Sequence, residues 1–299
     1  MDQHLAVFIT VAEKQNFSRA AEELHMTQPA VSQYIQALER TMGTKLLERS
    51  NKYVHLNKAG EIVYHHAKEI VGLYGKMHYL IDDLTNNPNG LLSIGASYSF
   101  GEYVLPQLIA DMQKKYPQIK PAITIGNTKE IAELVLGHQL DVGIVEGQYK
   151  EKNLKIEPFA VDKMSIVASP KNRLSHIEGE VSITDIEKEI WIVRENGSGT
   201  REATEKLFNQ LNIAPKKILE FGSTQLIKES VEAGIGISLL SDWVIRKERD
   251  FGSLAVIKVK GFSLTREFSV VLRSPFQTKA LSVFLKLLKG QNKKADKQL

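Results

Sequence analysis

Hydrophobic residues at the start of the chain follow the spacing of two short helices. The first is predicted from apolar residues at positions i, i+3, i+4 and i+7, which share one helical face: Leu5, Phe8, Ile9 and Ala12. Asn16 and Phe17 then interrupt this spacing. Ser18 is expected to cap a second, short helix over residues 19–24 by accepting a hydrogen bond from a backbone amide.

A third helix is predicted after Thr27, which is a second capping residue. Pro29 lies in the first turn, where the N–H that proline lacks would have no helical partner. Gly43 is well placed to end the helix. The apolar face of this helix consists of Val31, Ile35, Leu38 and Met42. Two short helices joined by a tight turn form a candidate helix-turn-helix.

The opposite face of the third helix is polar but uncharged. Gln28, Ser32, Gln33 and Gln36 offer donors and acceptors that match base edges in a major groove. A face that is merely solvated more often carries Lys and Glu. The residues therefore predict a DNA-reading helix, with a plain three-helix bundle as the alternative, because this geometry also occurs as scaffolding.

Residues 46–56 alternate weakly around the turn-prone Ser50-Asn51-Lys52, as expected of a small β-hairpin. Arg49 and Lys52 suit contacts with phosphates or a minor groove. The residues expected to contact DNA are Ser18, Arg19, Thr27, Gln28, Pro29, Ala30, Ser32, Gln33, Gln36, Arg49, Asn51 and Lys52.

The next helix, capped by Asn57, carries the longest periodic pattern of the chain. Its apolar residues alternate at intervals of four and three, which is the a/d spacing of a coiled coil: Val63, Ala67, Ile70, Tyr74, Met77, Ile81 and Leu84. A stripe this narrow favours dimerisation through the helix. The alternative is an amphipathic helix packed on its own domain, which usually has a wider apolar stripe. Residues 86–90, Asn-Asn-Pro-Asn-Gly, mark a linker.

Beyond residue 90, short apolar runs alternate with helical stretches, the pattern of a parallel sheet covered by helices. A first set has predicted strands at 91–96, 122–125 and 141–145, with helices over 102–116 and 129–137. A second such set has strands at 164–168, 190–193, 218–221 and 235–240, with helices over 201–211 and 225–233. A final strand, 267–272, precedes a closing helix over 278–288.

Polar residues recur where predicted strands meet the helices that follow. In open α/β sheets ligands bind beyond the carboxyl ends of the strands, and the free amides of helix N-termini favour an anion. Each such Ser or Thr is individually explained by hydroxyl capping, but four junctions of this kind favour a shared cleft for a small anion. The candidate residues are Ser97, Tyr98, Ser99, Asn127, Thr128, Gly197, Ser198, Gly199, Thr200, Arg201, Ser223 and Thr224. Arg194 and Arg201 are candidates to supply a cation, or are plain surface charges.

The composition fits a protein of two or three domains. The chain has 299 residues, no cysteine, no apolar run long enough for a bilayer and no export signal, so we expect a cytoplasmic protein without disulfides. The net charge of +4 lies partly in a lysine-rich tail, residues 291–299, expected to be a solubilising end. A more informative local basic cluster consists of Arg40, Lys45, Arg49, Lys52 and Lys58.

The residues give little support to catalysis. The Gly-Ser-Gly-Thr stretch at 197–200 lacks the lysine and spacing of a P-loop, and no Gly-x-Ser-x-Gly motif occurs. His65 and His66 are adjacent on a helix, so their side chains are expected to point apart rather than to bind one metal ion. We expect no enzyme, no cofactor and no metal site.

Several segments resemble the LysR-type transcriptional regulators. In the N-terminal part they are residues 17–24, 27–32, 38–39, 43, 46–47, 49 and 59–60, and in the remainder residues 103–106, 116–117, 140–144 and 232–237. Leu47 stands where the family commonly has phenylalanine, and Asn57 replaces a common threonine but is still able to cap.

The resemblance implies an α+β multidomain protein. Its parts would be a winged helix-turn-helix over 1–58, a linker and dimerisation helix over 59–87, and a two-lobed α/β, periplasmic-binding-protein-like effector domain over 91–290. Lobe I would comprise about residues 91–160 and 266–290, and lobe II about 161–265, with crossover strands near 160 and 265. The implied partners are double-stranded promoter or operator DNA, a small anionic metabolite, further copies of the chain in a dimer or a dimer of dimers, and RNA polymerase as a candidate.

Residues 144–147 and 160–201 resemble most the regulators of sulfur assimilation or carbon fixation, which respond to small anionic metabolites. This resemblance adds Glu146 to the candidate effector-binding residues. The alternative from another class is a solute-binding or enzymatic α/β protein with an unrelated helical appendage. That alternative predicts a monomer without salt-sensitive DNA binding.

Overall fold

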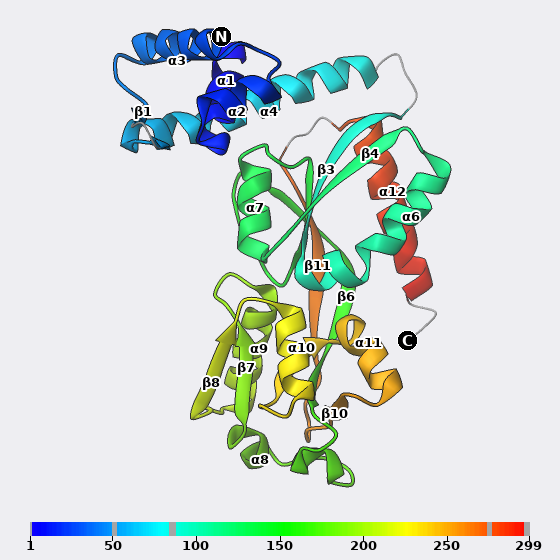
Figure 1. Cartoon of the computed structure of the whole chain (residues 1–299). Helices are drawn as coiled ribbons and strands as arrows, with labels where there is room; N and C mark the ends of the chain where they lie inside the picture. Colours follow the sequence, from blue (N-terminus) through cyan, green and yellow to red (C-terminus); the bar gives the residue numbers. More distant parts are fainter. Residues whose placement is uncertain (1, 50–52, 84–87, 274–276, 296–299) are drawn as a thin grey trace. The chain divides into compact units, whose positions relative to one another are not determined.

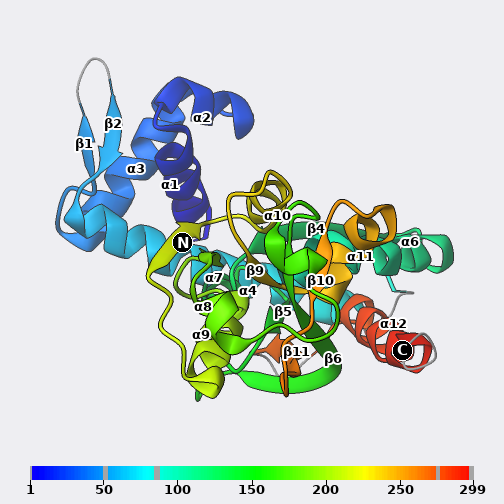
Figure 2. The ribbon, with the colours of Figure 1, turned by 90° about the horizontal axis from the view of Figure 1, so that it is seen from below.

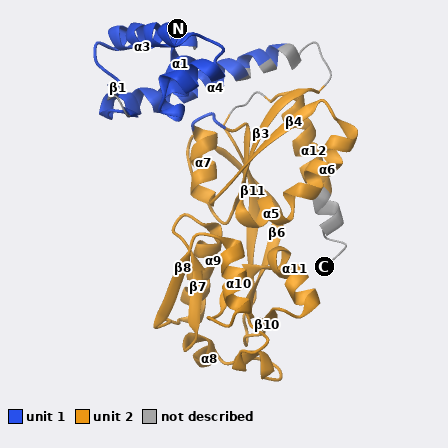
Figure 3. Ribbon diagram, in the orientation of Figure 1, with its two compact units in different colours: residues 1–85, 137–139 blue, residues 86–136, 140–299 orange. Residues whose placement is uncertain are grey.

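The structure, a computed structural model, describes residues 2–49, 53–83, 88–273 and 277–295. The chain divides into two compact units (Figure 3): residues 1–85 with 137–139, and residues 86–136 with 140–299. Each unit has its own hydrophobic core. Within the described residues, no helix is both long enough and apolar enough to span a bilayer.

The first unit is helical and carries one small hairpin. Its elements are α1 (Asp2–Lys14), α2 (Phe17–Glu23), α3 (Gln28–Met42), β1 (Leu47–Arg49), β2 (Val54–Leu56) and α4 (Lys58–Asp83). The strands β1 and β2 pair antiparallel, with Leu47 opposite Leu56, and form the narrow hairpin seen in Figure 2. The predicted helices and hairpin are therefore confirmed as elements.

Three predicted helix boundaries in this unit are confirmed. The Thr27 hydroxyl accepts a hydrogen bond from the N–H of Ala30 at 3.4 Å, and the Asn57 side chain accepts one from the N–H of Gly60 at 2.8 Å. Gly43 ends α3 with a φ of 68°, a conformation that glycine adopts without strain.

The prediction that Ser18 caps α2 is wrong. The side-chain oxygen of Asn16 accepts hydrogen bonds from the N–H groups of Ser18 and Arg19, at 2.8 and 3.0 Å, and α2 begins at Phe17. Asparagine is as effective a cap as serine, and here it lies at the residue where the backbone is still extended.

The coiled-coil spacing of α4 divides into two parts. Val63 and Ala67 pack into the core of the first unit, as the alternative of a helix packed on its own domain predicts for this end. The next four residues of the spacing are exposed: Ile70, Tyr74, Met77 and Ile81. Leu84 lies outside the described residues. The exposed four form an apolar stripe that their own unit leaves open to contact.

The second unit begins with β3 (Gly90–Ser97), α5 (Tyr98–Tyr103), α6 (Leu105–Lys115), β4 (Ile119–Gly126), α7 (Thr128–Leu136), β5 (Val142–Glu146) and β6 (Lys155–Ala168). It continues with η1 (Arg173–His176), α8 (Ile183–Glu187), β7 (Ile190–Arg194), α9 (Gly199–Leu211), β8 (Lys217–Phe221) and α10 (Thr224–Glu232). It ends with β9 (Ser238–Ser241), α11 (Asp242–Phe251), β10 (Ala255–Ile257), β11 (Leu264–Leu272) and α12 (Lys279–Ala295).

Two long strands connect the two halves of this unit. A mixed sheet has the order β10-β6-β11-β5-β3-β4, with β9 also paired to β6. β6 and β11 are antiparallel over nine paired positions and run from one half into the other (Figure 1). We call the half with β3, β4, β5, α5, α6, α7 and α12 lobe I, and the half with β7 to β10 and α8 to α11 lobe II. β6 and β11 belong to both.

The predicted parallel arrangement is confirmed for lobe I, where β3 pairs parallel with β4 and β5. In lobe II the prediction is wrong in part. β7 and β8 are parallel, but the segment 164–168 belongs to β6, which is antiparallel to β9 and β10. β6 is one of the two long strands that connect the lobes, and its neighbours are antiparallel to it, so it is not part of a βαβ series in lobe II.

The predicted helix over 102–116 is interrupted. The chain forms α5 and α6 instead, separated at Val104, and Pro106 lies in the first turn of α6. Proline has no N–H to continue the hydrogen bonding of the preceding helix, which explains the break. The helix α11 and the strand β10 were also missed. α11 carries local signals, since the Ser241 side chain caps it and Gly252 ends it with a φ of 74°, whereas β10 has only three residues.

We expect Ile35→Ala to destabilise the first unit by about 2–5 kcal/mol, because it leaves a cavity at a fully buried position of α3. Gln36→Ala, on the exposed face of the same helix, should change the free energy of unfolding by less than about 0.5 kcal/mol. Denaturant unfolding followed by circular dichroism compares the two. An equal loss in both variants would contradict the two-faced arrangement of α3.

Candidate functional site

The polar residues of α3 lie on the surface of the first unit. Gln28, Gln33 and Gln36 are exposed, whereas Val31 and Ile35 on the opposite face are buried. Gln28 donates a hydrogen bond from Nε2 to the hydroxyl of Ser32 at 3.0 Å. Uncharged donors and acceptors thus form one continuous face, which is able to meet base edges.

The other residues expected to contact DNA differ in what the structure describes. Ser18 and Arg19 are exposed at the start of α2, Thr27 and Pro29 are exposed at the start of α3, and Ala30 is half-buried. Asn51 and Lys52 lie outside the described residues, as does the side chain of Arg49, whose backbone belongs to β1.

A buried carboxylate that sequence reasoning missed ties α3 to the hairpin. Glu39 accepts a hydrogen bond from the N–H of Leu46 at 3.0 Å and forms an ion pair with Lys45 at 3.2 Å. One lysine of the predicted basic cluster is therefore neutralised by its own unit. Glu39 lies one turn after the buried Ile35 on the same side of α3, which is a signal that its carboxylate has a structural role.

In the second unit, three of the candidate hydroxyl residues converge on Glu146 at the end of β5. Glu146 Oε1 accepts hydrogen bonds from the backbone N–H groups of Ser99 and Phe100, at 2.8 and 3.4 Å. Its Oε2 accepts one from the Thr200 hydroxyl at 3.5 Å. The Thr128 hydroxyl bonds to both backbone polar groups of Glu146, at 3.0 and 3.2 Å. These contacts join residues of lobe I and lobe II.

Arg266 of β11 lies at the centre of this cluster, and sequence reasoning missed it. Its guanidinium pairs with Glu146 at 2.6 Å and with Asp162 of β6 at 2.8 Å. It also donates to the hydroxyls of Ser99 and Thr200, both at 2.9 Å. A sequence signal was available, because Arg266 lies two residues from Leu264 and Phe268 on the same buried face of β11. An arginine on such a face requires partners.

Burial and charge act in opposite directions within the cluster. Burial raises the pKa of Asp162 above its usual value, although Arg266 and the hydroxyl of Ser241 act to lower it. Burial disfavours the charge on Arg266, but the attraction of Glu146 and Asp162 outweighs it and holds the pKa of the guanidinium above its usual value. Arg266 therefore stays charged and shares its charge between two carboxylates.

A second cluster joins the lobes around Arg194. Its guanidinium lies over the ring of Tyr98, 4.3 Å from the ring centre, and donates to the Thr224 hydroxyl at 2.7 Å. It also makes two hydrogen bonds of 2.7 Å to Glu195, and Asn127 donates to the same carboxylate at 3.3 Å. Three further candidate residues thus come together, but the arginine they surround already has an acidic partner.

The remaining serines of the candidate set act locally. Ser198 and Ser223 cap α9 and α10 by accepting hydrogen bonds from backbone amides. The prediction of a hydroxyl cap is wrong for Ser97, whose hydroxyl donates to the carbonyl of Ile144 at 3.2 Å. Adjacent strands β3 and β5 bring that carbonyl closer than the first turn of α5.

Arg201 does not join the clusters. It forms ion pairs with Glu205 and Glu220, at 2.7 and 2.8 Å, within lobe II. Its charge is therefore neutralised on the surface of α9, and only its hydrogen bond to the carbonyl of Arg194 links it to the second cluster.

Two glycines allow the lobes to touch. A Cβ atom on Gly199 would lie 2.3 Å from the carbonyl oxygen of Glu146, a distance that real side chains do not reach. Gly197 has a φ of 90°, and its carbonyl accepts a hydrogen bond from the N–H of Lys129 at 3.2 Å. The lobes are closed onto each other at these positions.

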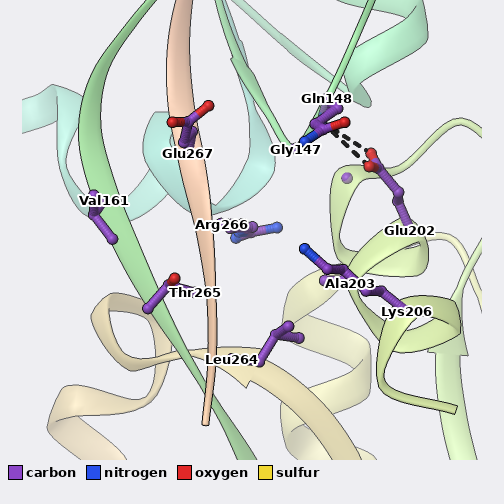
Figure 4. A pocket seen from close by; sticks show the side chains of 11 residues that line it. Gly147, Gln148, Val161, Glu202, Ala203, Lys206, Leu264, Thr265, Arg266 and Glu267 are labelled. Carbon is purple, nitrogen blue, oxygen red and sulfur yellow. Dashed lines mark hydrogen bonds between the residues drawn. The ribbon is translucent and has the colours of Figure 1, made fainter. Parts of the chain in front are cut away.

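A cavity of about 380 Å³ lies beside Arg266 (Figure 4). Its lining includes the turn after β5, the first turns of α9, and β6 and β11, and the residues are Gly147, Gln148, Val161, Gly199, Glu202, Ala203, Lys206, Leu264, Thr265, Arg266 and Glu267. Its volume is in the range of small-molecule sites. Arg266 and Lys206 line it together with the carboxylates of Glu202 and Glu267, and an arginine suits recognition of an acidic group.

The expectation that His65 and His66 point apart is wrong. Glu69 lies one turn further along α4, between the two, and both imidazoles turn to it, at 4.0 Å from His65 and 3.3 Å from His66. The three ligand atoms lie within 4.8 Å of one another. The hydrogen bond between His66 and Glu69 and the approach of His65 to the same carboxylate account for this arrangement.

Two family models match the chain. One is described as "Bacterial regulatory helix-turn-helix protein, lysR family" and matches residues 3–61; the other, "LysR substrate binding domain", matches residues 85–293. The HTH-type transcriptional regulator CysL of Bacillus subtilis is 39% identical over 288 residues, 96% of either chain. The RuBisCO operon transcriptional regulator of Acidithiobacillus ferrooxidans is 33% identical over 89% of this chain and 86% of its own.

Solved structures have a similar fold, one over nearly the whole chain and one over its larger part. CbnR in complex with its target DNA has a TM-score of 0.73 at 22% identity, covering 97% of this chain and 99% of that chain. The regulatory domain of Synechocystis CcmR in complex with 2-PG has a TM-score of 0.62 at 27% identity, covering 69% of this chain and 98% of that chain.

We expect Arg266→Met to destabilise the second unit by about 3–5 kcal/mol at neutral pH, because it leaves Glu146 and Asp162 buried without their shared cation. The raised pKa of Asp162 means that the folded state holds a proton more firmly than the unfolded state. Because Arg266 acts to lower this pKa, its removal raises the pKa further. Protonation of Asp162 therefore stabilises the folded variant more than the folded wild type at low pH, and this stabilisation is lost as the pH rises through the raised pKa. The destabilisation relative to wild type should shrink towards acidic pH.

Urea unfolding of wild type and variant across this pH range measures the difference. Arg249→Met, which removes a half-exposed arginine paired with Asp242 at 3.9 Å, is the matched control and should cost less than about 1 kcal/mol. A destabilisation by Arg266→Met that is small, or that grows as the pH falls, would show that the cluster does not depend on the arginine.

Proposed function

The chain belongs to the LysR family of bacterial transcription regulators, and on that premise we propose that it reads operator DNA through the polar face of α3 and responds to a small anionic metabolite held between its lobes. Members are DNA-binding regulators with an effector-binding domain, not enzymes. The observation that carries the DNA-reading part of the proposal is the exposure of Gln28, Gln33 and Gln36 opposite a buried apolar face.

The proposed DNA contacts divide into two kinds. Gln28, Ser32, Gln33 and Gln36 would contact base edges, since amide and hydroxyl groups match the donor and acceptor pattern of the major groove. Ser18, Arg19, Thr27, Pro29 and Ala30 would position the helix on the backbone, together with Arg49, Asn51 and Lys52 of the hairpin. The first set determines specificity and the second set affinity.

The proposed effector site is the interlobe region around Glu146 and Arg266. It is supported by the convergence of Ser99, Thr128 and Thr200 from two lobes and by the adjacent cavity. The CcmR regulatory domain was solved with 2-PG, which supports a small ligand in a domain of this fold. The name of the RuBisCO operon regulator and the residue-level resemblance support a link to carbon or sulfur assimilation genes.

We further propose that the chain self-associates through α4 and acts in the cytoplasm. Four exposed apolar residues of α4 support self-association, because a second copy of the helix would cover them: Ile70, Tyr74, Met77 and Ile81. The domain limits proposed are 1–58, 59–87 and 91–290, with the tail 291–299. The alternative of a solute-binding or enzymatic protein with an unrelated helical appendage is excluded, because both parts of the chain match one family.

We expect Gln33→Ala to relax base preference at one operator position by about 1–3 kcal/mol while leaving affinity for random DNA unchanged. Operator sequences are first selected from a random library with the wild-type protein, and binding of both proteins is then measured at several salt concentrations. Thr41→Ala, at the far end of the same helix, is the control. Equal losses by Gln33→Ala on selected and random DNA would remove this residue from base reading.

We expect Met77→Glu to weaken self-association at least about tenfold, because a charge would be buried without a partner between two apolar stripes. Sedimentation of the full chain over a range of concentrations measures the change. Phe251→Glu is the matched control, since it places the same charge at an exposed apolar residue of α11. If Met77→Glu sediments as the wild type does, α4 is not the dimer surface.

A further inference from the structure

The carboxylate of Glu146 occupies the position in which an acidic ligand would find its donors. Two backbone amides, the Thr200 hydroxyl and the Arg266 guanidinium all direct hydrogen bonds to it. The side chains of Arg266, Thr200 and Glu146 are each more than nine-tenths buried. These donors come from both lobes, so they form one site only when the lobes are closed.

The charges around Arg266 would allow the Glu146 side chain to move away from the guanidinium. The guanidinium is shared between Glu146 and Asp162, and Asp162 is itself held by the Ser241 hydroxyl at 2.7 Å. If Glu146 moved away, Arg266 would keep one carboxylate partner. NH1 would still donate to the Thr200 hydroxyl, but its second N–H and the hydrogen of that hydroxyl would be free to bind a second anion.

We propose that Glu146 is an internal carboxylate that fills the acidic-group position of the effector site, and that a small oxyanion or carboxylate acts by displacing it from Arg266. This inference rests on the proposed function and identifies Glu146 as the group that competes with the ligand for the effector site. The cavity beside Arg266 supplies a route, because Gly147 and Arg266 line it (Figure 4), as does Gly199, and the two glycines are the neighbours of Glu146 and Thr200.

Displacement would change the contact between the lobes. Glu146 lies at the end of β5 in lobe I, whereas Thr200 lies on α9 in lobe II, and Gly199 touches the Glu146 backbone. An anion in place of the side chain keeps the donors satisfied but removes the covalent link between the bound carboxylate and lobe I. The ligand thus alters the closed state through the residue that it replaces.

The alternative is a fixed structural ion pair that no ligand displaces. The two differ in what removal of the side chain does. A displaceable carboxylate leaves a site that accepts a free anion, whereas a fixed ion pair leaves a collapsed or solvated gap without anion preference.

The test measures binding of sulfate and acetate to the purified full chain by calorimetry, with thermal unfolding at constant ionic strength as a second readout. Glu146→Ala vacates the position, and Glu146→Gln keeps the shape without the charge. Glu267→Ala, which removes an exposed carboxylate from the same cavity lining, is the matched control. Each anion is compared with chloride.

We expect the anions to bind Glu146→Ala at least about tenfold more tightly than wild type, with Glu146→Gln in between and Glu267→Ala unchanged. Acetate should also raise the melting temperature of Glu146→Ala towards that of wild type. Equal anion affinity in Glu146→Gln and wild type overturns the proposal, even if Glu146→Ala cannot be purified. An equal gain in Glu267→Ala also overturns it, since removal of any nearby negative charge would then suffice.

The outcome is separable from the proposed function. Salt-sensitive, sequence-dependent DNA binding by the first unit does not involve Glu146, so it would persist if the displacement failed. Loss of sequence-dependent DNA binding in the wild type would instead count against the proposed function.

Discussion

The buried charge of Arg266 is the constraint on which the arrangement of the second unit depends. Its partners come from lobe I, from lobe II and from β6, and it lies on β11, which crosses between the lobes. A buried ion pair adds little net stability, because desolvation offsets the attraction, but loss of one partner is costly. The contact between the lobes at this point therefore depends on the carboxylates and hydroxyls that surround Arg266.

The arrangement of the first unit depends on apolar packing of α3. Its recognition surface requires only that α3 be anchored along one face, and Val31, Ile35 and Leu38 provide that anchor. Glu39 extends it by fixing the backbone at Leu46, which precedes the hairpin. The exposed polar face of α3 then contributes to the fold only through the hydrogen bond between Gln28 and Ser32, as far as the described residues show. Such a division lets specificity change without loss of the fold.

Most elements could be predicted from the sequence, because periodic apolar residues and caps such as Thr27 and Asn57 are local signals. Strand direction in lobe II could not, since β6 pairs with segments 71 to 117 residues away that no local pattern identifies. The candidate site was predicted in part, since Glu146, Ser99, Thr128 and Thr200 were among the expected residues. Asp162 and Arg266 were missed because their importance arises from being buried together, although they lie 104 residues apart.

The same residue types cap helices and bind ligands, and the range of each hydrogen bond separates the two roles. Ser198 and Ser223 bond within three residues of themselves, so they serve their own helices. The hydroxyls of Ser99 and Thr200 instead accept from Arg266, at separations of 167 and 66 residues. Hydroxyls whose partners lie on another strand or lobe depend on the closed arrangement. Together with the bonds that Asn127 and Lys129 make to Glu195 and Gly197, these bonds are made or lost when the lobes move, whereas the caps of Ser198 and Ser223 are not.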